Sequence, residues 1–147
     1  MGTKLQMFRI AGAVASMCML AACSGDPTTG TSGAASGEPA QYATYTDQFA
    51  ELQTSGLRGD YPGFARALKV EDPASVVAQL NRSFGGKPFD VVTREANSDT
   101  STHKRAVELR NTTGRMYLFV EMAKVPGGWV VSEHDLSRQR APILARL

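Results

Sequence analysis

The amino-acid sequence predicts an α+β protein in which N-terminal helices pack on an antiparallel sheet of three or four strands. Three observations support this prediction. Between residues 42 and 84 apolar residues recur every three or four positions, which is the spacing of one helix face. From residue 88 onward they alternate, which is the spacing of a strand. Helices followed by successive strands are the order of the α+β class.

The first helix is predicted from residue 42 onward. Tyr42, Tyr45, Phe49 and Leu52 are spaced so that a helix brings all four side chains onto one side. Gly56 is the expected end of this helix, because glycine readily adopts the left-handed conformation that closes many helices. The four apolar side chains would then face the sheet.

Two further helices are predicted where an aspartate is soon followed by a proline. Asp60 and Asp72 can accept hydrogen bonds from the free N–H groups of a first helical turn. Pro62 and Pro73 fit that turn because proline lacks an N–H that would go unpaired. Gly85 is expected to end the second of these helices. The side chains expected to face inward are Phe64, Ala67 and Leu68 in the first helix and Val76, Val77, Leu80 and Phe84 in the second.

Four later segments have the pattern of strands. Val107 and Leu109 alternate with polar residues and are expected to face inward, whereas Arg105 and Glu108 are expected at or near solvent. The third segment is apolar on both faces, which predicts a central strand. Together with the helices these segments make residues 42–136 a single domain. The four strand segments are 88–96, 104–111, 116–125 and 129–136.

Residues 137–147 are interpreted as a basic C-terminal tail. Arginines alternate there with Ile143, Leu144 and Leu147, and Pro142 interrupts any helix that would run through them. A disordered end is the first expectation. The alternative is a short amphipathic piece that touches lipid or a partner.

Residues 1–22 have the pattern of a secretory signal peptide. Lys4 and Arg9 are followed by an uncharged stretch, residues 10–22, built from small and apolar side chains. This stretch is shorter than the roughly 20 residues that a membrane-spanning helix needs. Export from the cytoplasm is therefore predicted.

The signal ends in the motif LAAC at residues 20–23, which resembles the lipobox of bacterial lipoproteins. That resemblance implies cleavage between Ala22 and Cys23 and lipidation of the Cys23 thiol, and two or more acyl chains hold a protein stably at a membrane. The expected location is the cell envelope. It would be the periplasmic face of the outer membrane in a Gram-negative host and the outer face of the plasma membrane in a Gram-positive one. Cys18 would be removed with the signal, so no disulfide is expected.

Residues 23–41 combine the lipidated cysteine with a linker rich in Gly, Ser, Thr, Ala and Pro, which has no large apolar residue to bury and should be flexible. Without Lys4 and Arg9, the mature chain keeps 14 basic and 14 acidic residues. This balance gives no electrostatic reason to expect a nucleic-acid partner. Phosphate-binding, dinucleotide and metal-ligand motifs are absent from the sequence, so neither a cofactor nor a metal is expected.

The order of the predicted elements resembles the cystatin-like and NTF2-like group of small envelope domains. GDYPGFARAL at residues 59–68 is similar to a helical G-D-x-x-x-A stretch common in that group. GGWVVSEHDL at residues 127–136 is similar to its final x-W-x-V strand. The resemblance implies an N-terminal helical layer that lies across a curved antiparallel sheet.

The same resemblance suggests residues for proton transfer. Some NTF2-like enzymes use an Asp or a His–Asp pair for acid–base chemistry. Asp90, or Asp135 with His134 and Tyr117, can be placed in these roles, although nothing in their spacing requires it. Alternation along a strand puts Asp135 and His134 on opposite faces. His103 is expected to be a solvated turn residue.

The leading hypothesis is a non-enzymatic binding domain, held at the membrane through its N-terminal lipid, that binds an envelope protein or a small apolar ligand. One alternative is an NTF2-like acid–base enzyme. Another is an inhibitor or exclusion factor that acts on a second envelope protein through the loop at residues 97–103. Five aromatic residues either line a pocket between helices and sheet or fill the core: Tyr45, Phe49, Phe64, Tyr117 and Trp129.

Overall fold

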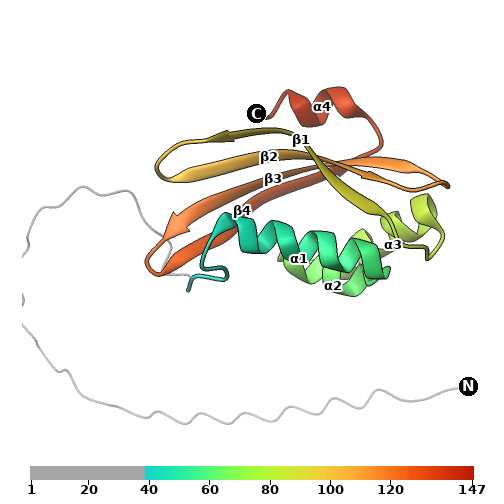
Figure 1. The fold of residues 1–147 in the computed structure, drawn as a ribbon, viewed down its shortest axis with the longest axis horizontal. Helices are drawn as coiled ribbons and strands as arrows, with labels where there is room; N and C mark the ends of the chain where they lie inside the picture. The colour runs from blue at the N-terminus through green and yellow to red at the C-terminus, as the bar shows by residue number, and fades with distance from the viewer. Residues whose placement is uncertain (1–38) are drawn as a thin grey trace, which may run out of the picture. The chain divides into compact units, whose positions relative to one another are not determined.

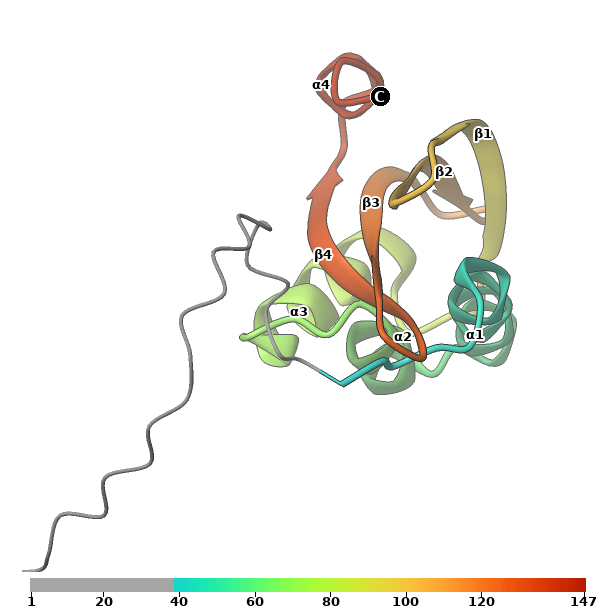
Figure 2. The same ribbon diagram turned by 90° about the vertical axis from the view of Figure 1, so that its left-hand side faces the viewer.

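Three helices lie on one face of a four-stranded antiparallel sheet, and a short C-terminal helix lies on the other (Figures 1 and 2). This computed structural model describes residues 39–147. Cys23, the expected signal peptide and most of the expected linker lie outside the described residues. The predicted α+β class is confirmed. The elements are α1 (Tyr45–Arg58), α2 (Tyr61–Ala67), α3 (Pro73–Phe84), β1 (Asp90–Ser98), β2 (Thr102–Arg110), β3 (Arg115–Val125), β4 (Gly128–Ser137) and α4 (Arg140–Leu144), and the strands pair in chain order.

Helix α1 begins and ends later than predicted. A capping box fixes its start, because the Thr44 side chain accepts from the Asp47 N–H and the Asp47 carboxylate accepts from the Thr44 N–H. Its end is Gly59, whose φ of 67° is left-handed. Gly56 therefore lies inside the helix. A Cβ there would approach the Phe89 carbonyl oxygen to 2.9 Å, so glycine is needed for close packing and does not end the helix.

The predicted starts of α2 and α3 are confirmed. Asp60 accepts from the Gly63 N–H at 2.8 Å, and Asp72 accepts from the Ser75 N–H at 3.2 Å. Gly85 closes α3 with a φ of 63°. Before α1 begins, Tyr42 forms an antiparallel β-bridge with Trp129, which attaches the start of the domain to β4.

The core lies between the three helices and the sheet and is rich in aromatic rings. Phe89 contacts three other rings, with centroid distances of 4.6 Å to Phe84, 5.2 Å to Phe64 and 5.7 Å to Tyr61. Burying each such side chain contributes about 1.5–3 kcal/mol. Val107 and Leu109 also face this core, as predicted.

The opposite face of the sheet corrects two predictions. The tail is not disordered, since α4 places Ile143, only 1% exposed, against Ala106 and Phe119. Those side chains would otherwise leave apolar surface in water, which is why the tail folds back. Glu108 is not at solvent either. It is 3% exposed because Arg94 and Arg115 on the neighbouring strands both pair with its carboxylate.

Candidate functional site

An open groove runs between α3 and β4. Its volume is about 590 Å³, and apolar and charged side chains share its lining. Val76 and Gln79 come from α3, and the connection from α2 to α3 supplies further lining residues. The lining residues are Leu68, Lys69, Val70, Glu71, Asp72, Ser75, Val76, Gln79 and the continuous run from Val131 to Leu136.

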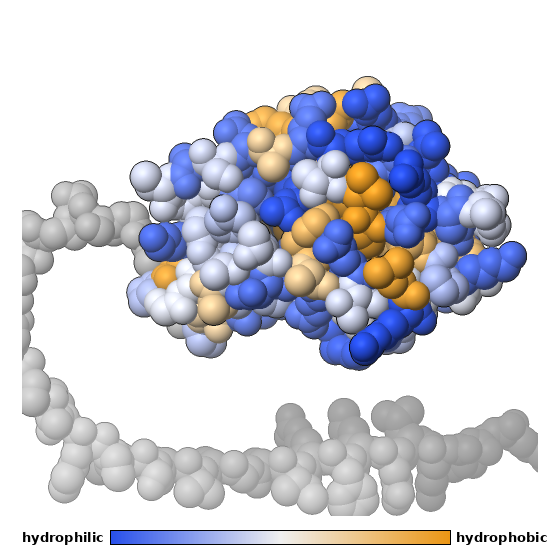
Figure 3. Space-filling model, in the orientation of Figure 1, coloured by the Kyte–Doolittle hydropathy of each residue, from blue (hydrophilic) through white to orange (hydrophobic). Residues whose placement is uncertain are grey.

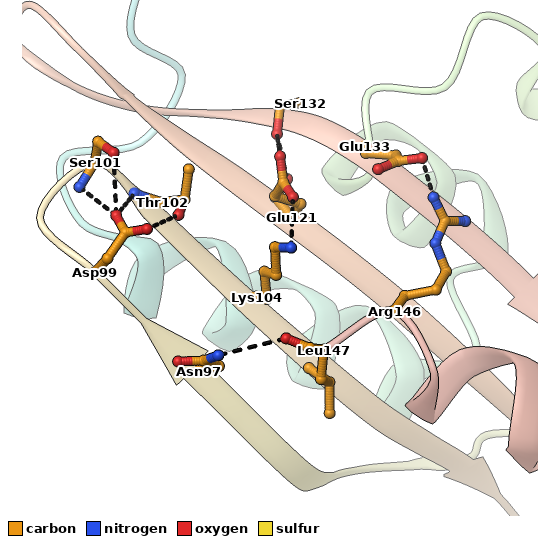
Figure 4. A network of polar contacts seen from close by, with 10 residues as sticks. All are labelled: Asn97, Asp99, Ser101, Thr102, Lys104, Glu121, Ser132, Glu133, Arg146 and Leu147. Carbon is orange, nitrogen blue, oxygen red and sulfur yellow. Dashed lines mark hydrogen bonds and ion pairs between the residues drawn. The ribbon is translucent and has the colours of Figure 1, made fainter.

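The groove contains His134, which is half-buried. Burial lowers the pKa of this imidazole, and the carboxylates of Asp135 and Glu133 oppose that shift. Both carboxylates pair with Arg146, which follows α4, and Asp135 lies 3.2 Å from that guanidinium (Figure 4 shows the Glu133 pair). They therefore share the α4 face of β4. His134 pairs in register with Val120, a residue of the helix-side core.

The residues placed in acid–base roles are not brought together. Tyr117 packs beside Phe119 in the cluster under α4, which is the face opposite His134. Asp135 points to that same face through its contact with Arg146. Asp90 begins β1, and β1 and β4 are the two opposite edges of the sheet. This arrangement supports no proton relay among the four residues.

Asp90 instead lies beside a smaller hollow of about 320 Å³, whose lining includes Leu57 and Phe89. Leu57 is 62% exposed, the largest exposure among the large apolar side chains of residues 39–147. Figure 3 shows hydrophobic areas interrupted by hydrophilic surface on the face of the molecule that it presents. Single exposed apolar residues are normal on protein surfaces, so this hollow carries less weight than the groove.

The five aromatic residues divide among three places. Phe64 is fully buried in the core, and Tyr117 lies on the α4 face. Tyr45, Phe49 and Trp129 are partly buried and pack against the edge of the helix-side core. The Tyr45 ring meets Trp129 edge-on, with centroids 5.4 Å apart.

The sequence did not predict that His103 joins this aromatic group through Tyr45. The Tyr45 ring stacks on the imidazole with centroids 4.0 Å apart and planes within 14°. His103 is 5% exposed and belongs to β2, so the prediction of a solvated turn residue is wrong. The sequence contains a signal for this. Residues 103, 105, 107 and 109 form one alternating row, but its first two members are polar and conceal the inward face.

Contacts with neighbouring side chains define the state of His103. Arg105 lies with a guanidinium nitrogen 3.1 Å from Nε2, and arginine can only donate, so Nε2 accepts. Nδ1 then carries the proton and donates to the Ser98 hydroxyl. Burial and the nearby Arg105 charge lower the pKa of His103. The imidazole is therefore a neutral structural link.

Arg105 is held by an aromatic ring as well as by His103. Its guanidinium carbon lies 4.1 Å from the centre of the Phe49 ring, a cation–π contact. Burial lowers the pKa of this arginine. Within residues 39–147, no carboxylate forms an ion pair with Arg105.

The hairpin between β1 and β2 is tightly bonded. The Asp99 carboxylate accepts from the N–H groups of Ser101 and Thr102, both at 2.7 Å, and from both hydroxyls (Figure 4). These hydrogen bonds hold the pKa of Asp99 well below its usual range, and the bond from the Thr102 hydroxyl has the largest effect. Part of the predicted loop at residues 97–103 is thus a rigid turn between two strands.

Two further features bear on the site. Within residues 39–147, no group of three or more His, Cys, Asp or Glu side chains is placed to hold a metal ion. None of the helices described is long and apolar enough to cross a membrane.

Comparisons with known proteins give a limited picture. No family model matches the chain, and no curated protein matches it. A solved structure with a similar chain trace is that of an NTF-2 like protein of unknown function from Silicibacter pomeroyi DSS-3. The two chains are 12% identical with a TM-score of 0.42, and the alignment covers 62% of this chain and 91% of that one.

Proposed function

We propose that this chain is a lipid-anchored protein of a bacterial cell envelope whose head domain binds another protein and catalyses no reaction. The observation that carries the proposal is the groove of about 590 Å³ between α3 and β4. It is open, and its lining mixes apolar residues with several charges. Protein partners recognise such mixed surfaces, whereas a small apolar ligand favours an enclosed apolar cavity.

The anchor part of the proposal is supported by the LAAC motif at residues 20–23. Its test is the variant Cys23→Ser in the bacterium that carries the gene. The parent protein should fractionate with membranes and carry acyl mass on its N-terminal cysteine. The variant should remain an uncleaved or soluble precursor. A variant that is processed normally and stays in membranes would remove the anchor from the proposal.

The binding part is tested in living cells by placing a photo-reactive residue in the groove of the full-length protein. Ser75 is exposed and lines the groove, whereas Ala78 is exposed on the same helix and does not. Light should join position 75 to one discrete partner and should leave position 78 unlinked. Equal cross-linking at both positions would mean that the groove has no special role.

The rigid hairpin gives one specific reason to keep the inhibitor as a second candidate. Asp99 fixes an exposed turn between β1 and β2, and a stiff exposed turn loses little entropy on insertion into a target. A photo-reactive residue at Thr100, which is exposed, distinguishes the two candidates. A partner captured at position 100 and missed at position 75 would favour the inhibitor.

A further inference from the structure

Two arginines from different parts of the chain line the same pair of hollows. The first hollow has a volume of about 320 Å³ and is lined by Gln79, Arg82, Met116 and Arg138. The second, of about 240 Å³, has both arginines in its lining as well. Because Arg82 and Arg138 belong to both linings, the two hollows adjoin one another at these side chains, and we call them the arginine hollows.

The elements that carry the two arginines meet on the helix side of the sheet. Arg82 lies in the last turn of α3, and Arg138 directly follows the end of β4. Met116, at the start of β3, is 2% exposed and belongs to the helix-side core. The first arginine hollow therefore combines an apolar side chain from the core with two cationic side chains.

The arginine hollows contain positive charge and no balancing carboxylate. No Asp or Glu from residues 39–147 lines either of them. Within the same residues, neither Arg82 nor Arg138 forms an ion pair. Arg115 also lines the second hollow, but its guanidinium pairs with Glu108 at 2.9 Å. Two unbalanced guanidinium groups at one concave place attract an anion.

The turn between β2 and β3 gives the second hollow a rigid border. The Asn111 side-chain oxygen accepts from the N–H groups of Thr113 and Gly114, at 2.7 and 3.0 Å. Gly114 packs so closely on α3 that a Cβ there would lie 2.4 Å from the Ser83 carbonyl oxygen. Ser83 lines the hollow too, and its buried hydroxyl has no hydrogen-bond partner within residues 39–147. A border that is already fixed lowers the entropy cost of binding.

Charge and shape indicate which anion fits. One guanidinium can bind both oxygens of a planar carboxylate, so a second arginine from another element is not needed for a carboxylate. A phosphate group is tetrahedral and carries roughly two negative charges at neutral pH, so Arg82 and Arg138 can contact different oxygens of it. The end of α3 carries a partial negative charge that opposes the anion, but this charge is smaller than the two full positive charges.

We propose that Arg82 and Arg138 together bind a phosphate group, whether of free phosphate or of a lipid headgroup. Gln79, in the first arginine hollow, supplies a neutral amide donor beside them. Gln79 also lines the groove between α3 and β4, so the phosphate site adjoins that groove. The site goes beyond the proposed function and does not depend on what the groove binds.

The test uses the full-length protein in detergent and phenylglyoxal, a reagent that modifies accessible guanidinium groups. Mass spectrometry follows each arginine separately, at constant ionic strength. One concentration of inorganic phosphate should half-protect both Arg82 and Arg138, and about ten times that concentration should slow their modification about tenfold. Arg58 and Arg140 are exposed, lie outside both linings and should react at unchanged rates. Acetate at the same concentrations should protect none of these arginines.

Matched variants test whether the two arginines hold the same ion. In Arg82→Gln, the phosphate concentration that half-protects Arg138 should rise about tenfold, which is the loss of one hydrogen bond to a charged group. Arg58→Gln makes the same change in the last turn of α1 and should leave that concentration unchanged. Both positions are exposed, so both variants should keep the urea midpoint of the parent protein.

Vesicles distinguish the two sources of phosphate. The protein is mixed with vesicles of phosphatidylcholine alone or of equal parts phosphatidylcholine and phosphatidylglycerol. Protection of Arg82 and Arg138 by the phosphatidylglycerol vesicles without added phosphate would support the site and identify a headgroup as its ligand. Protection only after inorganic phosphate is added would support the site and identify the free ion.

Other results would overturn the proposal. Equal slowing at Arg58 and Arg140 would mean that phosphate acts on arginines in general. Protection of Arg138 that survives Arg82→Gln unchanged would mean that the two arginines do not share an ion. Equal protection by acetate would overturn the choice of phosphate. If neither inorganic phosphate nor either kind of vesicle protects the two arginines, the site fails even where position 75 captures a partner in cells.

Discussion

The two faces of the sheet are covered in different ways. On one face, three helices bury a continuous core in which Phe64 and Phe84 both contact Phe89. On the other, a single five-residue helix covers Ala106 and Phe119, and the buried carboxylate of Glu108 lies on the same face, two residues along β2 from Ala106. Burial of apolar surface stabilises the packing on the first face. On the second face, one small apolar contact and several ion pairs do so. We therefore expect substitutions on the first face to unfold the domain and those on the second to act locally.

The largest effect should come from the helix side. Phe64→Ala removes a fully buried ring that contacts Phe89, and it should lower the free energy of unfolding by about 3–5 kcal/mol. Urea unfolding followed by circular dichroism measures this. Phe64→Leu, which refills most of the space, should cost clearly less. A loss below about 1 kcal/mol for the alanine variant would show that this core is not close-packed.

On the α4 face, Ile143→Ala should cost about 2–3 kcal/mol, because the side chain is 1% exposed. The loss should be confined to α4 and its contacts, including the cation–π contact of Arg146 with Phe119. Hydrogen exchange should accelerate in residues 140–147 and stay slow in α1 to α3. Uniform acceleration through both layers would contradict the division between the faces.

The buried carboxylate should contribute less. Glu108→Gln leaves Arg94 and Arg115 without their anion, but the side chains of both arginines are partly exposed and can be rehydrated. A loss of about 1–2 kcal/mol is expected, below the range for fully buried pairs. Glu121→Gln is the matched control on the same face, where Lys104 lies 3.6 Å away, and it should cost under about 1 kcal/mol. Equal losses would mean that burial of Glu108 adds nothing.

The same contrast explains what could be predicted from the sequence. Helices α2 and α3 have local signals, an aspartate cap and an early proline, and both were predicted with the correct starts. The burial of Glu108 depends on Arg94 and Arg115, which lie on two other strands, so no local pattern announces it. Ile143 is buried because it packs on Ala106 and Phe119, which lie on β2 and β3 and are distant from it in sequence.

No local pattern predicts the groove, because it depends on how α3 lies against β4. His134 lines it, although the sequence suggested this residue only for acid–base chemistry, and Trp129 is not among the lining residues. The polar stretch around His103 predicts a turn. In the structure His103 belongs to β2, in the same inward row as Val107 and Leu109, and stacks on Tyr45, which is distant in sequence.

The smallest expected effect is a pH dependence from His103. Burial and Arg105 hold its folded pKa below that of an unfolded histidine, near 6.5. As the pH falls through about 6.5, the unfolded chain therefore binds a proton that the folded chain resists, and stability falls. Tyr45 packs on the imidazole and adds no charge at these pH values.

Urea midpoints should drop between about pH 7.5 and about pH 5.5, and His103→Gln should flatten that drop. His134→Gln serves as the control. Burial lowers the pKa of His134 too, so this variant should remove only the contribution of His134 to the drop. An unchanged slope in the His103 variant would show that this histidine is not the group that loses stability in acid.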